Sequence, residues 1–121
     1  MTYESSAVVP SERHEGVCFT VAKMSFVRRL ELMRRVRELA SRMEFFAAGK
    51  GEKNELEAAI LSSEIDQLYL VWGLREVTGL VIDGEPATPE SLAGSGPEDL
   101  MREALSAVKS ECGLSEAERK N

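Results

Sequence analysis

Apolar residues recur at spacings of three and four along two long stretches of this 121-residue chain, and this pattern restricts its fold more than any other feature. In the first stretch these positions are Phe26, Leu30, Met33, Val36, Ala40, Met43 and Ala47. In the second stretch, over residues 54–76, they include Leu61, Ile65, Leu68 and Trp72. Because an α-helix has 3.6 residues per turn, each set lies on one helix face. Gly49 and Gly51 can end the first helix and turn the chain, so we predict an antiparallel helical hairpin.

The rest of the chain predicts short strands and one more helix. Residues 17–23 alternate in polarity and are rich in β-branched and aromatic side chains, which predicts a strand. We predict a second strand at 80–82, before the Asp83–Gly84 turn, and expect it to pair with 17–23 because unpaired backbone groups are costly. A C-terminal helix is predicted from Pro97 to Gly113. The predicted fold class is therefore α+β, mostly α: an antiparallel helical hairpin plus a C-terminal helix with a small two-stranded β element.

The ends of the chain differ in composition from its middle. Residues 1–15 mix serine, proline and charged residues without a sustained period, so we predict a flexible N-terminal arm. Residues 16–114 are predicted to form a single helical domain. The last residues, 115–121, are mostly charged or polar and predict a charged C-terminal tail.

Arginine is concentrated in the segment 24–46, where six arginines and three glutamates give a net charge of +3. The segment 52–76 has a net charge of −4, and the whole chain carries −6, which repels nucleic-acid phosphates. Opposite charges stand four residues apart in Glu31/Arg35, Arg34/Glu38 and Glu38/Arg42. Such pairs stabilise a helix, so we expect much of the positive charge to be neutralised within the fold. A nucleic-acid-binding regulator that uses the arginine-rich helix 24–46 is kept as an alternative function.

The residues that usually carry catalysis or bind metals are sparse and scattered. The single histidine, His14, lies in the predicted arm, where a catalytic geometry is hard to maintain. Cys18 and Cys112 are far apart in sequence and show no metal-binding or redox spacing. Acidic residues such as Glu64 and Asp66 do not converge on a helix surface. We therefore expect no enzymatic activity, no catalytic residues, no metal site and no cofactor or small-molecule substrate.

The widest apolar surface on the predicted hairpin suggests a protein partner or a homo-oligomer. Three residues widen the first stripe on one side, and three lie at the end of the second, next to a possible interhelical groove. They could simply form the core, but two wide stripes in a small chain can also leave apolar surface uncovered. The predicted partner-binding residues are Leu32, Leu39, Phe46, Leu68, Tyr69 and Trp72.

Localisation is predicted from the lack of long apolar runs. No run is long enough to span a membrane, and the first residues do not have the pattern of a signal peptide. We therefore expect a cytoplasmic protein that does not bind membranes.

The later part of the chain resembles small proteins encoded among the tail genes of bacteriophages and prophages, in particular tail-assembly chaperone-like proteins. The resemblance covers residues 16–121 in general organisation. Its segments are EIDQLYLVWGL, VTGLVIDGEPATPESL and GPEDLMREALSAVKSECGLSEAERKN, together with FTVAKMSFVRRLEL, where a short strand leads into a helix.

The resemblance implies a non-enzymatic assembly factor of a phage or prophage tail. Such a factor would bind a tape-measure-like client and keep its long hydrophobic helices soluble. The implied location is the cytoplasm of a bacterial host, with possible association with the virion. A virion structural component, such as a connector or minor tail protein, is the alternative within this class.

Overall fold

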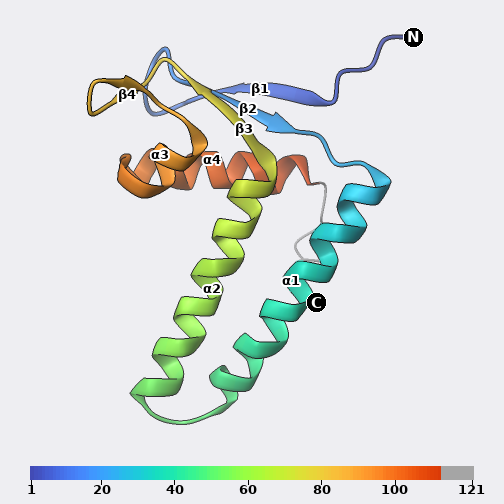
Figure 1. The fold of residues 1–121 in the computed structure, drawn as a ribbon, viewed down its shortest axis with the longest axis vertical. Coiled ribbons are helices and arrows are strands. Elements are labelled where there is room, and N and C mark those ends of the chain that lie inside the picture. Colours follow the sequence, from blue (N-terminus) through green and yellow to red (C-terminus); the bar gives the residue numbers. More distant parts are fainter. Residues whose placement is uncertain (113–121) are drawn as a thin grey trace. The chain divides into compact units, whose positions relative to one another are not determined.

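The structure is a computed structural model, and it describes residues 1–112 (Figure 1). The described chain divides into two compact units. Unit 1 consists of residues 1–24 and 69–112, and unit 2 is Ser25–Leu68. The fold class is α+β and mostly α, as predicted. The predicted tail at 115–121 and the predicted helix end at Gly113 lie outside the described residues.

Unit 1 contains an antiparallel sheet of three strands: β1 (Ser6–Pro10), β2 (Cys18–Ala22) and β3 (Leu74–Thr78). Their order is β1-β2-β3, with β2 in the centre (Figure 1). Phe19 of β2 pairs with Val9 on one side and with Val77 on the other. The predicted strand at 17–23 is therefore confirmed, but it has two neighbours instead of one.

The arm prediction for residues 1–15 is wrong at β1. Residues 6–10 pair along their whole length with β2, from Ser6 opposite Ala22 to Pro10 opposite Cys18. Proline is tolerated there because β1 is an edge strand and needs hydrogen bonds on one side only. The pairing partner, which the local composition does not reveal, decides the structure of this segment.

The partner predicted for β2 is also wrong. Helix α2 (Glu52–Gly73) ends three residues before the predicted end at residue 76, and the chain continues directly into β3. The segment that we expected to pair with β2 forms β4 (Val81–Ile82), which pairs instead with β5 (Glu85–Pro86). The predicted turn joins these two strands, with Asp83 and Gly84 both at positive φ. The β structure thus has three strands plus two.

Two helices complete unit 1. Helix α3 (Pro89–Ser95) begins with a capping box between Thr88 and Ser91, and α4 (Glu98–Glu111) follows it. Helix α4 packs against β2 and β3, and α3 packs against α4 and β3. Their apolar side chains meet those of the sheet in one core, whose buried members include Phe19, Val21, Val77, Leu92, Leu100, Ala104 and Val108.

Unit 2 is a helical hairpin, as predicted. Helix α1 (Phe26–Ala48) and the residues of α2 up to Leu68 run in opposite directions and are joined by a short turn (Figure 1). Gly51 has a φ of +103°, a conformation that glycine adopts without strain. The Asn54 side chain donates a hydrogen bond to the Lys50 carbonyl and closes the turn. Residues 69–73 of α2 belong to unit 1.

No helix within residues 1–112 combines the length and the apolar character needed to cross a lipid bilayer.

Candidate partner-binding surface

Unit 2 exposes many large apolar side chains. In α1 these are Phe26, Val27, Leu30, Met33 and Phe45, and in the unit 2 part of α2 they are Leu56 and Ile60. Phe26 is 86% exposed and Leu56 is 62% exposed. By contrast, the buried apolar residues of unit 2 are Leu32 and Leu61. Single exposed apolar residues are common in proteins, but a group at helical spacing indicates a binding surface.

The first group lies in the opening turns of α1. Phe26, Leu30 and Met33 have the spacing of one helix face, and all three are exposed. Arg34 continues the row that starts at Phe26 and Leu30, and Arg37 follows Met33 by four residues; both arginines are exposed. We call these five residues the α1 patch. It is an apolar strip with positive charge at its C-terminal end.

The second group lies in the opening turns of α2. Glu52, Leu56, Ile60 and Glu64 are each four residues apart and all exposed, so they form one continuous ridge along the helix. We call these four residues the α2 ridge. It has an apolar centre with a carboxylate at each end. The α1 patch and the α2 ridge are therefore alike in their apolar part and opposite in charge.

The predicted partner-binding residues are placed differently. Leu39, Phe46, Leu68 and Trp72 are half-buried, and the ring of Phe46 lies edge-on to Phe45 with 5.4 Å between centroids. Leu32 is only 1% exposed. In unit 1, Tyr69 is buried, and the ammonium group of Lys109 lies 5.4 Å from its ring centroid.

The prediction is corrected for the two buried residues. The chain itself covers Leu32 and Tyr69, so neither is available at the surface for a partner. The sequence pattern predicted Phe26, Leu30 and Met33 on one apolar stripe and Leu32 at the margin of that stripe. In the structure Leu32 is buried, whereas Phe26, Leu30 and Met33 at the start of the stripe are exposed. One signal was available: Arg37 lies on the same face as Phe26 and Leu30, which favours a solvent-facing strip.

The charges of α1 are less paired than predicted. Within residues 1–112, Arg34, Glu38 and Arg42 form no ion pair, so the predicted pairs Arg34/Glu38 and Glu38/Arg42 are not made. Exposed pairs of this kind contribute little stability, and side-chain entropy opposes them.

Polar groups in unit 1 hold the turn between β1 and β2 against α4. The Ser11 hydroxyl donates to Glu103 Oε1 at 2.6 Å, and the Glu12 amide donates to Glu103 Oε2 at 2.7 Å. His14 Nε2 lies 3.0 Å from Asp99 Oδ2. The hydrogen bond with His14 is the main reason that the pKa of Asp99 lies below its ordinary value, and the Leu100 amide adds to the effect. These contacts explain His14 as a structural residue.

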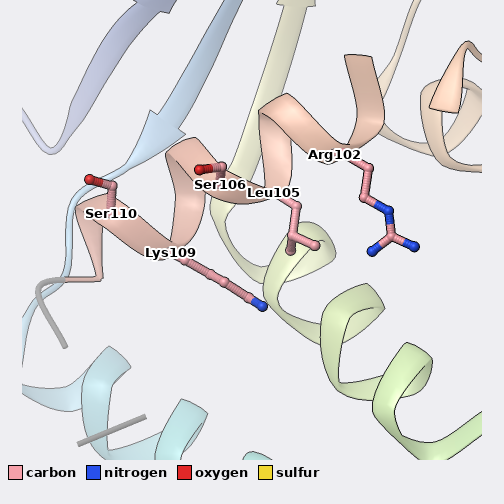
Figure 2. Close-up of a pocket in the computed structure, with 5 residues that line it drawn as sticks. All are labelled: Arg102, Leu105, Ser106, Lys109 and Ser110. Carbon is pink, nitrogen blue, oxygen red and sulfur yellow. The ribbon is translucent and has the colours of Figure 1, made fainter. Parts of the chain in front are cut away.

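A shallow depression of about 410 Å³ on unit 1 is lined by Arg102, Leu105, Ser106, Lys109 and Ser110 (Figure 2). All five belong to α4. The hydroxyls of Ser106 and Ser110 point to a different side of the helix from Leu105 and Lys109, so the side chains do not converge on one point (Figure 2). The depression therefore brings no nucleophile and base together.

The potential metal ligands of the described chain are dispersed. Among residues 1–112, no three His, Cys, Asp or Glu side chains form a group that could hold a metal ion. Cys18 is half-buried in β2, Cys112 is buried after α4, and both are free thiols. The feature of this structure with the clearest binding chemistry is the exposed apolar and charged surface of unit 2.

Comparisons with known protein families, with curated proteins and with solved structures gave no match to this chain, so its function is argued from its own residues and geometry.

Proposed function

We propose that this protein is a non-enzymatic assembly factor that binds a helical segment of another protein through unit 2. The observation that carries the proposal is the exposure of Phe26, Leu30 and Met33 on one face of α1, next to Arg34, which forms no ion pair within residues 1–112. An amphipathic helix recognises such a strip through its own apolar face, and charged residues at the margin set its orientation.

The resemblance to tail-assembly chaperone-like proteins suggests the identity of the client. A tape-measure-like protein contains long hydrophobic helices that must stay soluble until tail subunits assemble around them. A factor for this task needs a reversible apolar contact, and the exposed rows of unit 2 meet that need. The proposal places the protein in the cytoplasm of a bacterial host while the tail is assembled.

Co-expression tests the proposal directly. The full chain is produced together with a tape-measure protein encoded in the same gene cluster, and the soluble fraction of that protein is compared with and without the chain. We expect the soluble fraction to rise and a complex to survive gel filtration. If solubility is unchanged and no complex forms, the proposed function is wrong.

A matched pair of variants locates the binding surface. Met33→Lys places a charge in the α1 patch, whereas Val8→Lys places one on β1, where Val8 is similarly exposed. We expect Met33→Lys to reduce the soluble complex and Val8→Lys to leave it unchanged. If both variants lose the same amount of soluble complex, the binding surface does not lie on unit 2. Protein that stays with purified particles would favour the structural-component alternative.

A second candidate function is nucleic-acid binding by α1, because the side chains of Arg34, Arg37 and Arg42 are exposed on this helix. In that case affinity must fall steeply with added salt, because each phosphate contact releases counterions. Reversal of the charge at Arg34 and Arg37 must also abolish binding to nucleic acid.

A further inference from the structure

We propose that, in the absence of a client, the α1 patch is covered by the α2 ridge of a second copy of this chain. The inference concerns the chain alone and does not depend on the identity of any client. The charges and the residue spacing of the α1 patch and the α2 ridge indicate that a second copy covers the exposed surface.

Charge complementarity is the first argument. Unit 2 contains eight basic and eight acidic residues, so its net charge is zero, but the two signs are separated along the chain. All six of its arginines are in α1, whereas the unit 2 part of α2 has one lysine, four glutamates and one aspartate. Arg34 and Arg37, at the C-terminal end of the α1 patch, can therefore pair with the carboxylate at one end of the α2 ridge. Opposite charges at an interface steer the partners together and fix their register.

Shape is the second argument. Glu52, Leu56, Ile60 and Glu64 form a row of side chains four residues apart, which is the ridge that most often fits the groove of another helix. The α1 patch presents two short rows on one helix face, Phe26–Leu30–Arg34 and Met33–Arg37. Leu56 and Ile60 can pack between these two rows while the carboxylates at both ends of the ridge remain near the surface.

The α1 patch and the α2 ridge lie in different parts of the hairpin, so the ridge that covers the patch must come from another copy. The α1 patch occupies the beginning of α1, and the α2 ridge occupies the beginning of α2. In an antiparallel hairpin the starts of the two helices lie at opposite ends, so the α1 patch and the α2 ridge occupy successive stretches along the hairpin axis and do not lie opposite each other. One hairpin therefore cannot place its α2 ridge on its own α1 patch.

The proposal gives one surface two successive uses. A second copy removes Phe26, Leu30 and Met33 from water until a client helix takes its place, so self-association and client binding compete. Because the contact is partly electrostatic, we expect it to weaken as salt is added.

Charge reversal on each side, followed by mixing, tests this contact. One variant of the full chain carries Arg34→Glu and Arg37→Glu, and the other carries Glu52→Lys and Glu64→Lys. The mass of each is measured by light scattering and sedimentation across a wide concentration range. We expect the unchanged chain to exceed the 13.4 kDa of a monomer and each variant to associate at least about tenfold more weakly.

Mixing the two variants should restore association, because each reversed α1 patch then meets a reversed α2 ridge. Circular dichroism checks that the helix content of both variants is unchanged. The control variant carries Arg13→Glu and Arg75→Glu on exposed residues of unit 1, which is the same charge change as Arg34→Glu with Arg37→Glu. It should associate like the unchanged chain.

Three results would overturn the inference: a monomeric unchanged chain, association that survives both reversals, or association that mixing does not restore. These results are distinct from failure of the proposed function, which is measured on the soluble client.

Discussion

The contact between His14 and Asp99 makes part of the stability of unit 1 depend on pH. The pKa of Asp99 lies below its ordinary value of 3.8, first because of the hydrogen bond with His14. A carboxyl whose pKa is lowered by folding stabilises the fold when it is ionised. The stabilisation by ionised Asp99 is therefore complete above pH 3.8. It is lost as the pH falls through the pKa of Asp99 in the folded state, which lies below 3.8.

We expect Asp99→Asn to lower the free energy of unfolding at pH 6 and to have less effect at pH 3. Urea denaturation at both pH values measures this, with Glu90→Gln as the control. Glu90 is also exposed in the first turn of a helix. Glu90→Gln therefore removes a negative charge from a helix N-terminus, as Asp99→Asn does, but it removes no contact with His14. An equal effect of Asp99→Asn at the two pH values would show that the contact with His14 does not stabilise the folded state.

Substitutions at two leucines of α1 distinguish the residues that stabilise unit 2 from those that form its binding surface. Leu32 is 1% exposed and Leu30 is 44% exposed, although they lie two residues apart. Leu32→Ala removes buried contacts and should lower the free energy of unfolding by about 2–5 kcal/mol. Leu30→Ala should cost about 1 kcal/mol or less, because much of its surface is already in water, yet it should weaken self-association and client binding. Thermal unfolding and light scattering on both variants check this; the reverse order would contradict the assigned faces.

At the scale of elements, the close approach of α2 and α4 depends on the missing side chain of Gly73. A Cβ atom there would collide with the side chain of Val108, which is buried and stiff because it is β-branched. Alanine normally improves a helix by about 1 kcal/mol over glycine, but overpacking costs about 1–3 kcal/mol. We therefore expect Gly73→Ala to be destabilising in chemical denaturation.

The matched control is Gly94→Ala in α3, where a Cβ atom would meet no atom within 4 Å. This change should be neutral or slightly stabilising. Combining Gly73→Ala with Val108→Ala should cost less than the sum of the two single changes, because the smaller side chain makes room. If the two costs simply add, the steric explanation is incorrect.

The helices were easier to predict from the sequence than the sheet, because their signals are local. Apolar residues at spacings of three and four identify α1 and most of α2 without knowledge of their neighbours. Strands β1 and β3 have no comparable signal: Pro10 suggests a loop, and the helix predicted up to residue 76 includes Leu74. Both segments become strands because β2 offers hydrogen bonds on both of its edges, and this depends on residues distant in sequence.

The predicted partner-binding residues and the exposed apolar residues of α1 lie on different sides of that helix. Periodicity shows that Phe26, Leu30 and Leu32 are apolar positions of a helix. It does not show which side of a wide stripe the rest of the chain covers. That choice depends on packing between elements, and the structure covers Leu32 while leaving Phe26 and Leu30 exposed.

At the scale of the whole molecule, the distribution of charge favours the proposed protein binding over nucleic-acid binding. Unit 2 is neutral, so the net charge of −6 belongs entirely to the rest of the chain. A nucleic acid that approaches the arginines of α1 therefore meets long-range repulsion, whereas the α2 ridge of another copy offers carboxylates at short range. We expect affinity for double-stranded DNA at physiological salt to be no tighter than the non-specific range of about 10⁻⁴–10⁻⁶ M.

Fluorescence anisotropy with a labelled duplex measures this affinity. The double variant with Arg34→Glu and Arg37→Glu should disrupt self-association far more than any residual DNA binding. Tight, salt-sensitive DNA binding that this double variant abolishes would instead assign the arginines to nucleic acid.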